Sequence, residues 1–328
     1  MLYVSRMRKS HDRLDLLDTF VKIGEAGSLS RAARLLGTTQ PTVSRRLLEL
    51  ERLFGCKLAL RDTARFSLTE EGRSALAEAR KLLEHWDGVS ERLSGAQRVP
   101  DGTLRVIGPS TYGANVLTDA ATDVREAYPN VRVEMTLTDR IVDLQAAGAD
   151  CWICVGRVPD TGLAVSTLGH MRRVLVAAPA LRNRWGRLTV KHLSELPFVG
   201  LVPHVVGQIR LNNTHGRVRT VQIDTPVLTD HLMATYRAVL DGMGIGVAAP
   251  WICNADIDAG RLVRVLPGWT LEPIPIQVVL PAGAYRPARV RAFIDCLRRR
   301  MAELDGFTPR SCLTRNAQNL PVMPCHGS

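Results

Sequence analysis

The segment from Ser28 to Leu47 constrains the fold of this chain more than any other stretch. Ser28 can cap a first helix that ends at Gly37. The apolar face of this helix comprises Leu29, Ala32, Ala33 and Leu36. Thr39 can cap a second helix, with Pro41 in its first turn. The inward stripe of the second helix comprises Val43, Leu47, Leu50 and Phe54. The spacing therefore predicts two short helices joined by a tight turn. Another helix, over about residues 14–24, precedes them.

Polar and basic side chains gather at the N-terminal end of the second predicted helix, largely off its apolar stripe. They are Thr39, Gln40, Pro41, Thr42, Ser44, Arg45 and Arg46. The N-terminal residues of a recognition helix reach base edges in the major groove, where Gln pairs with adenine and Arg with guanine. We expect Gln40, Pro41, Ser44 and Arg45 to face bases, and Thr42 and Arg46 to contact the DNA backbone. An ordinary three-helix bundle with a solvated polar face is the alternative.

The charge of the chain is placed unevenly. The 328 residues carry a net charge of +11, and residues 1–66 hold 13 lysine and arginine residues against 7 acidic ones. This balance favours an anionic partner such as DNA, although it also suits a membrane surface. No stretch approaches the roughly 18 apolar residues of a spanning helix. The start has no apolar segment typical of a secretory signal, and seven scattered cysteines do not resemble a disulfide framework. We expect a cytoplasmic protein.

A wing and a long helix follow the predicted helix-turn-helix. Two short strands, about residues 56–61 and 65–69, carry Arg61 and Arg65, which suit phosphate or minor-groove contact. The helix that starts near Glu70 then shows apolar residues in steps of three and four, which is a heptad seam. This seam comprises Leu76, Ala79, Leu83, Trp86, Ser90 and Leu93. It predicts self-pairing, with packing onto the chain's own core as the alternative.

Residues 14–72 resemble the winged helix-turn-helix of the LysR-type transcriptional regulators. The shared motifs are Gly27-Ser28-Leu29-Ser30-x-Ala32-Ala33, Gln40-Pro41-x-Val43-Ser44, Leu50-Glu51 and Leu68-Thr69-x-x-Gly72, together with Phe20, Gly55 and Arg61. One departure is Leu58-Ala59, where the family usually has Leu-Phe, and the missing aromatic predicts looser packing of the wing. The resemblance implies an antiparallel pair of linker helices in a dimer, with Leu76, Ala79, Leu83, Trp86 and Leu93 at the contact.

Strand-like and helix-like segments alternate after a hinge at residues 95–102. This alternation predicts α/β layers with parallel strand pairing. The expected elements include a short helix at about residues 141–147 and strands at 174–178 and 276–280. The resemblance continues here through Tyr128-Pro129-x-Val131, Gly148-x-Asp150 and Gly242-x-Gly244-Ile245-Gly246. It implies a bilobed, periplasmic-binding-protein-like effector domain.

The expected organisation is α/β as a whole and has four parts. A winged helix-turn-helix domain spans residues 12–69, and a linker or dimerisation helix spans 70–94. The effector-binding domain spans 102–303, with lobe I at 102–173 plus 276–303 and lobe II at 174–275. Residues 305–328 show little apolar periodicity and are expected to form a mobile tail.

The effector is expected between the two lobes. Ser110 and Thr111 follow the first strand and open a helix, where N–H groups and hydroxyls can hold an anion. Thr138 follows the second strand, Val202 and His204 lie at the crossover between lobes, and Thr229 precedes a lobe II helix. The alternative for these polar side chains is that each caps its own helix.

Three other motifs resemble redox, dinucleotide or metal sites but lack the required spacing or position. The cysteines of Cys151-Trp152-Ile153-Cys154 lie three apart in a predicted strand and point to opposite faces, so we interpret them as structural. Gly242-Met243-Gly244-Ile245-Gly246 precedes a strand and lacks the spacing of a dinucleotide loop. His170, His192 and His204 show no metal-ligand spacing. We expect no metal, no cofactor and no catalytic residue.

The sequence therefore predicts a DNA-binding transcriptional regulator controlled by a small, anionic effector. It would bind double-stranded operator DNA as a homodimer or tetramer and act through RNA polymerase, without a membrane partner. Two alternatives remain open. One is an enzyme or solute-binding module tethered to DNA, which turnover of a bound ligand would reveal. The other is a regulator that senses oxidants through a cysteine.

Overall fold

The structure is a computed structural model that describes residues 2–61, 66–94, 99–144, 146–158, 162–186, 188–213, 215–281 and 286–310. The chain forms two compact units, one within residues 1–99 and one that begins at Pro100. Among the described residues, no helix is both long enough and apolar enough to cross a membrane.

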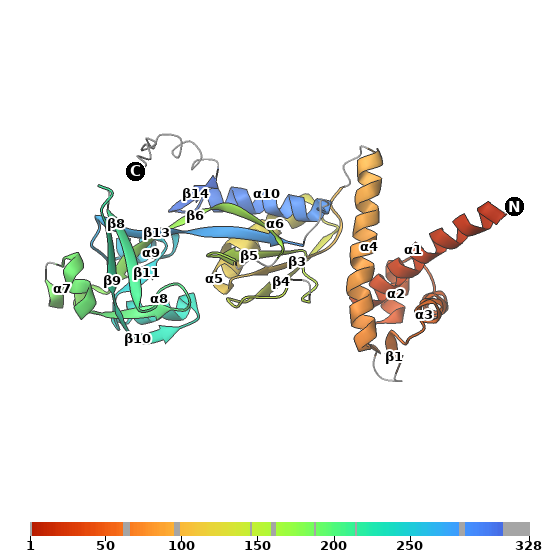
Figure 1. The fold of residues 1–328 in the computed structure, drawn as a ribbon, viewed down its shortest axis with the longest axis horizontal. Helices are drawn as coiled ribbons and strands as arrows, with labels where there is room; N and C mark the ends of the chain where they lie inside the picture. The colour runs from red at the N-terminus through yellow and green to blue at the C-terminus, as the bar shows by residue number, and fades with distance from the viewer. Residues whose placement is uncertain are drawn as a thin grey trace, which may run out of the picture. The chain divides into compact units, whose positions relative to one another are not determined.

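The first unit is a helical bundle with a small two-stranded wing (Figure 1). Its elements are α1 (Leu2–Ala26), α2 (Leu29–Leu35), α3 (Gln40–Phe54), β1 (Ala59–Arg61), β2 (Phe66–Leu68) and α4 (Glu70–Ser94). The strands β1 and β2 pair antiparallel. The first helix extends well beyond the predicted residues 14–24 and ends just before Gly27, which has a φ of 60°.

The apolar stripes of α1, α2 and α3 meet in one core. Phe20, Ala32, Val43 and Leu47 are all buried there. Gly72 lets the start of α4 approach the wing, because a Cβ at this position would lie 1.9 Å from the carbonyl oxygen of Leu58. Ala59 is buried in the same core, at the place where the sequence predicted looser packing.

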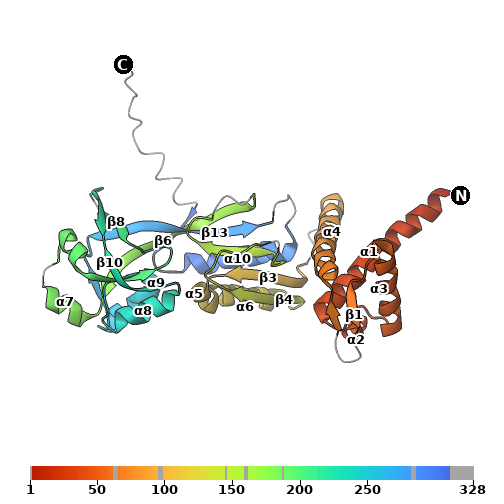
Figure 2. The ribbon, with the colours of Figure 1, turned by 60° about the horizontal axis from the view of Figure 1, so that its bottom comes forward.

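The second unit has two layers of helices around mixed sheets (Figures 1 and 2). Its helices are α5 (Ser110–Tyr112), a π-helix (Gly113–Leu117), α6 (Thr118–Ala127), α7 (Pro179–Trp185), a 3₁₀ helix (Val190–Glu195), α8 (Leu232–Leu240), α9 (Pro250–Asp258) and α10 (Ala288–Ala302). Its strands are β3 (Gly102–Gly108), β4 (Val131–Leu137), β5 (Cys151–Val155), β6 (Ala164–Ala177), β7 (Pro197–Leu201), β8 (Gln208–Asn213), β9 (Val218–Gln222), β10 (Asp224–Thr229), β11 (Gly246–Ala248), β12 (Val263–Val265), β13 (Trp269–Leu280) and β14 (Phe307–Pro309).

Strand pairing in this unit is mixed, not purely parallel as predicted. The strand β3 pairs parallel with β4 and β5, and β10 pairs parallel with β7. The two longest strands, β6 and β13, pair antiparallel with each other. The sequence predicted only their ends, 174–178 and 276–280, because a strand buried along one part and exposed along another shows no single period.

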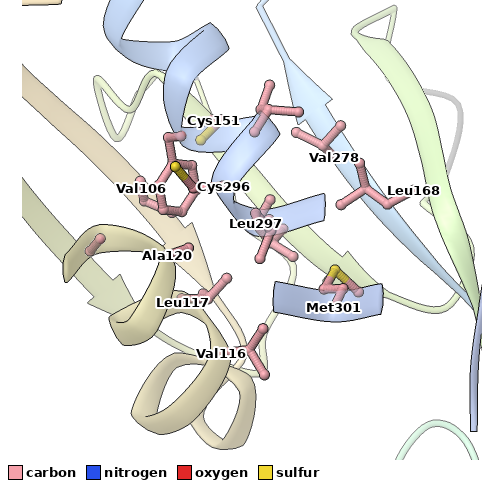
Figure 3. Close-up of a cluster of buried hydrophobic side chains, with 14 of the residues drawn as sticks. Val106, Val116, Leu117, Ala120, Cys151, Leu168, Val278, Cys296, Leu297 and Met301 are labelled. Carbon is pink, nitrogen blue, oxygen red and sulfur yellow. The ribbon is translucent and has the colours of Figure 1, made fainter. Parts of the chain in front are cut away.

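Hydrophobic clusters lie along different parts of β6 and β13. One cluster packs α6 and α10 onto β3, β5 and the residues Leu168 and Met171 of β6. Figure 3 shows its centre, where Leu117, Leu297 and Met301 face the sheet residues Val106 and Val278. Other clusters gather around Leu175 and Val176 farther along β6. The long strand pair thus runs through both hydrophobic regions of the unit.

Three local predictions need correction. The described residues of 141–147 form turns instead of a helix, because Asp143 closes a single turn with Ala146 and Ala147. The helix α9 was not predicted, since its apolar residues show no clear helical face. Phe307–Pro309 pair with β6 and do not belong to a tail. The remainder of the expected tail, residues 311–328, lies outside the described residues.

Candidate nucleic-acid interface and ligand cavity

The N-terminal end of α3 presents a polar surface over an apolar core. Thr39 occupies the N-cap position with an extended backbone but makes no side-chain capping bond, and Pro41 lies in the first turn. Gln40, Pro41 and Arg45 are exposed. Of the predicted apolar stripe, Val43 and the two leucines are buried, whereas Phe54 is 50 % exposed. Thr42 and Ser44 are half-buried, and the hydroxyls of Thr39 and Thr42 lie 2.9 Å apart. The structure thus brings the residues predicted to read bases to one accessible helix end, and their contact with DNA stays a prediction.

Arg46 is held differently from Arg45. Its Nη1 donates to the hydroxyl of Thr19 on α1 at 3.0 Å, and that hydroxyl donates to the carbonyl oxygen of Asp15 at 2.7 Å. This chain of hydrogen bonds ties α3 to α1 and occupies one guanidinium donor inside the unit. Arg46 therefore fixes the placement of the helix, a role that its position in the sequence did not indicate.

Glu51 joins the other end of α3 to the wing. Its Oε1 accepts hydrogen bonds from the backbone N–H groups of Leu58 and Ala59, at 3.0 and 3.3 Å, and its Oε2 accepts one from Lys57 at 3.0 Å. Burial alone would raise the pKa of this carboxyl, but these hydrogen bonds hold the pKa below its usual value. Glu51 is thus an ionised, 6 % exposed carboxylate that fixes the start of β1 against the helix.

The wing arginines can be located only in part. Arg61 ends β1, and its side chain is not among those described. Arg65 lies outside the described residues. Their predicted contact with DNA therefore rests on the sequence alone.

The predicted dimer seam on α4 divides into two halves. Leu76 and Ala79 are buried in the core of their own unit, where α4 packs against α1, and Leu83 is partly covered there. The expectation that Leu76 and Ala79 face a second copy is therefore wrong, because α1 already occupies that face. Trp86 and Leu93 are 57 % and 84 % exposed, and Leu82 beside them is also exposed. The apolar surface left for a partner is the C-terminal half of α4.

A cavity of about 60 Å³ lies in the second unit, beside the long strands β6 and β13. Its wall is mostly apolar. The lining residues are Tyr112, Val155, Met171, Arg173, Leu201, His204, Val205, Leu232, Val247, Ala248, Ala249, Ile252 and Ile274. Tyr112 packs edge-on against Trp251, with ring centroids 5.3 Å apart. The free volume is far below the roughly 300–1,000 Å³ of pockets that hold small molecules, so the cavity is too small for a ligand of ordinary size.

Arg173 and His204 are the basic side chains that line this cavity. The Nε and Nη2 of Arg173 donate to the backbone carbonyl oxygen of Glu272, at 3.1 and 2.7 Å. Burial, together with the positive charge of Arg173, lowers the pKa of His204, and the charge of Asp139 opposes this shift. His204 is therefore neutral at pH 7, and one guanidinium dominates the field inside the cavity.

Of the six predicted effector residues, only His204 lines this cavity. The hydroxyl of Thr138 accepts from the N–H of Arg140, and that of Thr229 accepts from the N–H of His231. Val202 donates its N–H to the carbonyl oxygen of Thr229. Thr138 and Thr229 thus accept from backbone groups two residues away, and neither caps a helix as the alternative predicted. The remaining two residues, Ser110 and Thr111, directly precede the lining residue Tyr112.

Thr111 differs from the other hydroxyl residues of the predicted site. It is 5 % exposed, and within the described part of the chain its Oγ1 has no hydrogen-bond partner. The N–H of the preceding Ser110 donates to a carboxylate oxygen of Asp139 at 3.3 Å. A buried hydroxyl without a partner is costly, so Thr111 is a position where a polar ligand atom would be stabilising.

Sequence reasoning missed most of the cavity wall. Arg173 lies inside a strand. A charged residue beside an apolar run was the only feature of the sequence that could have indicated its role. Tyr112, Ile252 and Ile274 come from three distant segments whose apolar side chains look like ordinary core residues. Only the fold brings them together.

The cysteines do not form a redox pair in the described residues. Cys151 belongs to the cluster with α10, and Cys154 packs against a different cluster around Trp152, so the two point to opposite faces as predicted. Burial raises the pKa of Cys151, raises that of Cys154 to about 11 and raises that of Cys253. These thiols are poor nucleophiles at neutral pH. No group of His, Cys, Asp and Glu among the described residues has the arrangement of a metal site.

Two family models match the chain. The model described as a bacterial regulatory helix-turn-helix protein of the lysR family matches residues 14–73. The model described as a LysR substrate binding domain matches residues 97–302. The predicted combination of a helix-turn-helix unit with an effector-binding α/β unit is therefore confirmed.

Known proteins resemble the chain over most of its length. The HTH-type transcriptional regulator PtxR of Pseudomonas aeruginosa is 34% identical over 304 residues, covering 89% of this chain and 94% of that protein. The HTH-type transcriptional activator AaeR of Escherichia coli is 29% identical and covers 87% of this chain and 93% of its own length. Among solved structures, CrgA of Neisseria meningitidis, described as a LysR-type transcriptional regulator, has a TM-score of 0.54 at 24% identity, covering 87% of this chain and 97% of that one. At this identity the structural likeness shows the fold alone.

Proposed function

Because the chain belongs to the LysR family of transcriptional regulators, we propose that its α3 reads an operator and that its second unit binds a small anionic effector. The exposed N-terminal end of α3 carries the first part of this proposal. Gln40, Pro41, Ser44 and Arg45 face bases, while Thr39, Thr42 and Arg46, with Arg61 and Arg65 of the wing, contact the backbone.

The domain boundaries proposed are those that the sequence indicates. The winged helix-turn-helix spans residues 12–69, the linker helix 70–94 and the effector domain 102–303. Lobe I comprises 102–173 with 276–303, and lobe II comprises 174–275. Separate hydrophobic clusters around Leu117 and around Leu175 support this division.

The effector proposal rests on the cavity chemistry. The guanidinium of Arg173 attracts an anion, and Ser110 and Thr111 lie next to the lining residue Tyr112. Because the free volume is only about 60 Å³, an effector of ordinary size would enter only if the wall moves apart. Binding would then favour the more open arrangement, as any ligand shifts a protein toward the state that it prefers.

The regulator is proposed to act as a homodimer or a dimer of dimers. The exposed Trp86 and Leu93 of α4 provide an apolar surface for a second copy, and a two-fold protein matches a pseudo-palindromic operator. Its place of action is the cytoplasm, where DNA and RNA polymerase are its partners.

Footprinting of the purified full-length protein on genomic DNA tests operator binding. On a bound site, Arg45→Ala should cost about 1–3 kcal/mol and relax specificity at one base position. Arg52→Ala is the matched control, since Arg52 is exposed on the same helix at its opposite end. A uniform loss across all sequences would show that Arg45 contacts phosphate only, and equal effects of both variants would contradict base reading by α3.

A further inference from the structure

Positive charge is concentrated in a second region of the chain. Residues 179–223 contain seven lysine and arginine residues and a single acidic residue, Glu195. The net charge of +6 in this region equals that of residues 1–66, so the rest of the chain is almost neutral. The region runs from the start of α7 to the end of β9, within the second unit.

The hairpin of β8 and β9 carries much of this charge. The strand β8 pairs with β13 on one side and with β9 on the other, and β9 pairs with β8 alone among the described strands. The tip of the hairpin extends away from α8 in both views (Figures 1 and 2). Arg210, Arg217 and Arg219 are all exposed on it. The 3₁₀ helix with the exposed Lys191 packs against β9.

Several surface arginines of the unit are paired with acidic side chains. Arg237, Arg261 and Arg298 each contact a nearby carboxylate. Within the described residues, neither Lys191 nor any of the three hairpin arginines has a carboxylate partner, and the guanidinium of Arg219 reaches only the carbonyl oxygen of Val218. A bound polyanion would supply the negative charge that these exposed cations lack nearby.

The other hairpin side chains indicate which polyanion fits. The outward positions beside Arg210 carry neutral hydrogen-bonding groups: Gln208, Asn212, Thr220 and Gln222. Arginine with such groups is typical of surfaces that contact nucleic-acid phosphates. Protein interfaces depend on large apolar or aromatic anchors, and the hairpin has none beyond Val218, which is 41 % exposed. The composition therefore favours DNA over an acidic protein.

We propose that the β8–β9 hairpin, with the adjoining Lys191, is a second DNA-contact surface that binds the phosphate backbone without reading sequence. This goes beyond the operator contact proposed for α3. Contacts of this kind add affinity that depends on salt and not on base sequence.

The test is the salt dependence of full-length protein binding to a random-sequence duplex of about 150 base pairs, a length that leaves room for several contacts. The triple variant R210Q/R217Q/R219Q should reduce the slope of log affinity against log salt by about 2–3, since each lost phosphate contact removes about 0.9. Between 50 and 200 mM salt, the unmodified protein would then lose about 40-fold more affinity than the variant. The matched control, R132Q/R172Q/R298Q, makes the same charge change at exposed positions outside the hairpin.

Further variants separate the possible outcomes. Lysine in place of the three arginines should keep the slope, and thermal unfolding of every variant verifies that it is folded. Equal slopes for the hairpin triple and the control triple would overturn the proposal. Loss of binding to purified RNA polymerase with DNA binding intact would overturn it too, because the partner would then be a protein. If Arg45→Ala has no effect on an operator while the hairpin triple still lowers the slope, the α3 proposal fails and this one stands.

Discussion

The N-terminal end of α3 and the cavity beside β6 are built from the sequence in opposite ways. The residues at the end of α3 are neighbours in the chain, from Thr39 to Arg46, and one helix places them on one surface. The cavity wall comes from segments as distant as Tyr112 and Ile274. The first surface follows from local periodicity, whereas the second exists only once long-range strand pairing has formed.

The two sites also differ in exposure and polarity. The reading surface is exposed and polar, and its geometry depends on buried contacts behind it, at Arg46 and Glu51. The cavity is small and mostly apolar, and its basic side chains, Arg173 and His204, are half-buried. Changes at the first site should thus act through the supports of the helix, and changes at the second through the cost of burying polar groups.

The first prediction tests whether the DNA-binding unit depends on contacts between distant residues as well as on local periodicity. Glu51→Ala removes the acceptor of two buried N–H groups, those of Leu58 and Ala59. Each unsatisfied donor costs about 1–3 kcal/mol, so the first unit should lose about 2–6 kcal/mol of stability. Urea unfolding followed by circular dichroism measures the change.

Glu49→Ala is the matched control, because Glu49 is exposed on the same helix. Glu51→Gln keeps one carbonyl acceptor and should fall between the two. A loss for Glu51→Ala no greater than for Glu49→Ala would show that the wing is held without this carboxylate.

A smaller change in stability is expected at Thr111, next to the cavity residue Tyr112. Thr111→Val replaces a buried hydroxyl that lacks a partner among the described residues with a methyl group of similar size. Stability should rise by up to about 1 kcal/mol, because the cost of burying an unpaired hydroxyl disappears.

Thr235→Val provides the contrast. Thr235 is equally buried, but its hydroxyl reaches the carbonyl oxygens of Gly200 and His231. The same replacement there should cost about 1 kcal/mol. If both variants lose stability to the same extent in thermal unfolding, the hydroxyl of Thr111 has a partner in solution.

The smallest effect is a pH dependence centred on His204. Its pKa is lowered in the folded protein, so the unfolded chain takes up a proton first as the pH falls. Stability should be unaffected by His204 above its unfolded pKa, near 6.5, and should decline below it. The ring lies close to Gly156 and shares the site with Arg173 and Asp139.

Unfolding of the unmodified protein and of His204→Gln at pH 8 and pH 5.5 measures this dependence. The variant should lose less stability between the two values than the unmodified protein. The same loss in both proteins would mean that His204 is not titrating in this window.

Features built from neighbouring residues, such as the end of α3, were predicted from the sequence, whereas features built from distant segments, such as the cavity, were not. The helices and the turn of the helix-turn-helix were predicted because each depends on residues within a few positions, although Ser28 and Thr39 make no side-chain capping bonds and Phe54 is exposed. The polar end of α3 was predicted for the same reason. Trp86 and Leu93 are exposed and their contact with a second copy stays a prediction, whereas Leu76 and Ala79 are covered by α1, which only the fold shows.

In the second unit, the missed features depend on long-range contacts. Parallel pairing was predicted from alternation, yet β6 and β13 run antiparallel to each other across both hydrophobic regions. Arg173 became a cavity residue only because β13 supplies the carbonyl oxygen that orients its guanidinium. Spacing along one segment contains no information about such a partner 99 residues away.

The strand pair β6–β13 has a mechanical consequence. Its register shifts twice, between Leu271 and Ile274 and between Ile276 and Gln277, so the ladder is interrupted near its middle. A continuous ladder is stiff, and an interrupted one bends and twists most easily at the interruption. The strand pair therefore turns near its middle, and the guanidinium of Arg173 bonds to the carbonyl oxygen of Glu272 within the first interruption, so that a side chain joins β6 to β13 where the ladder does not.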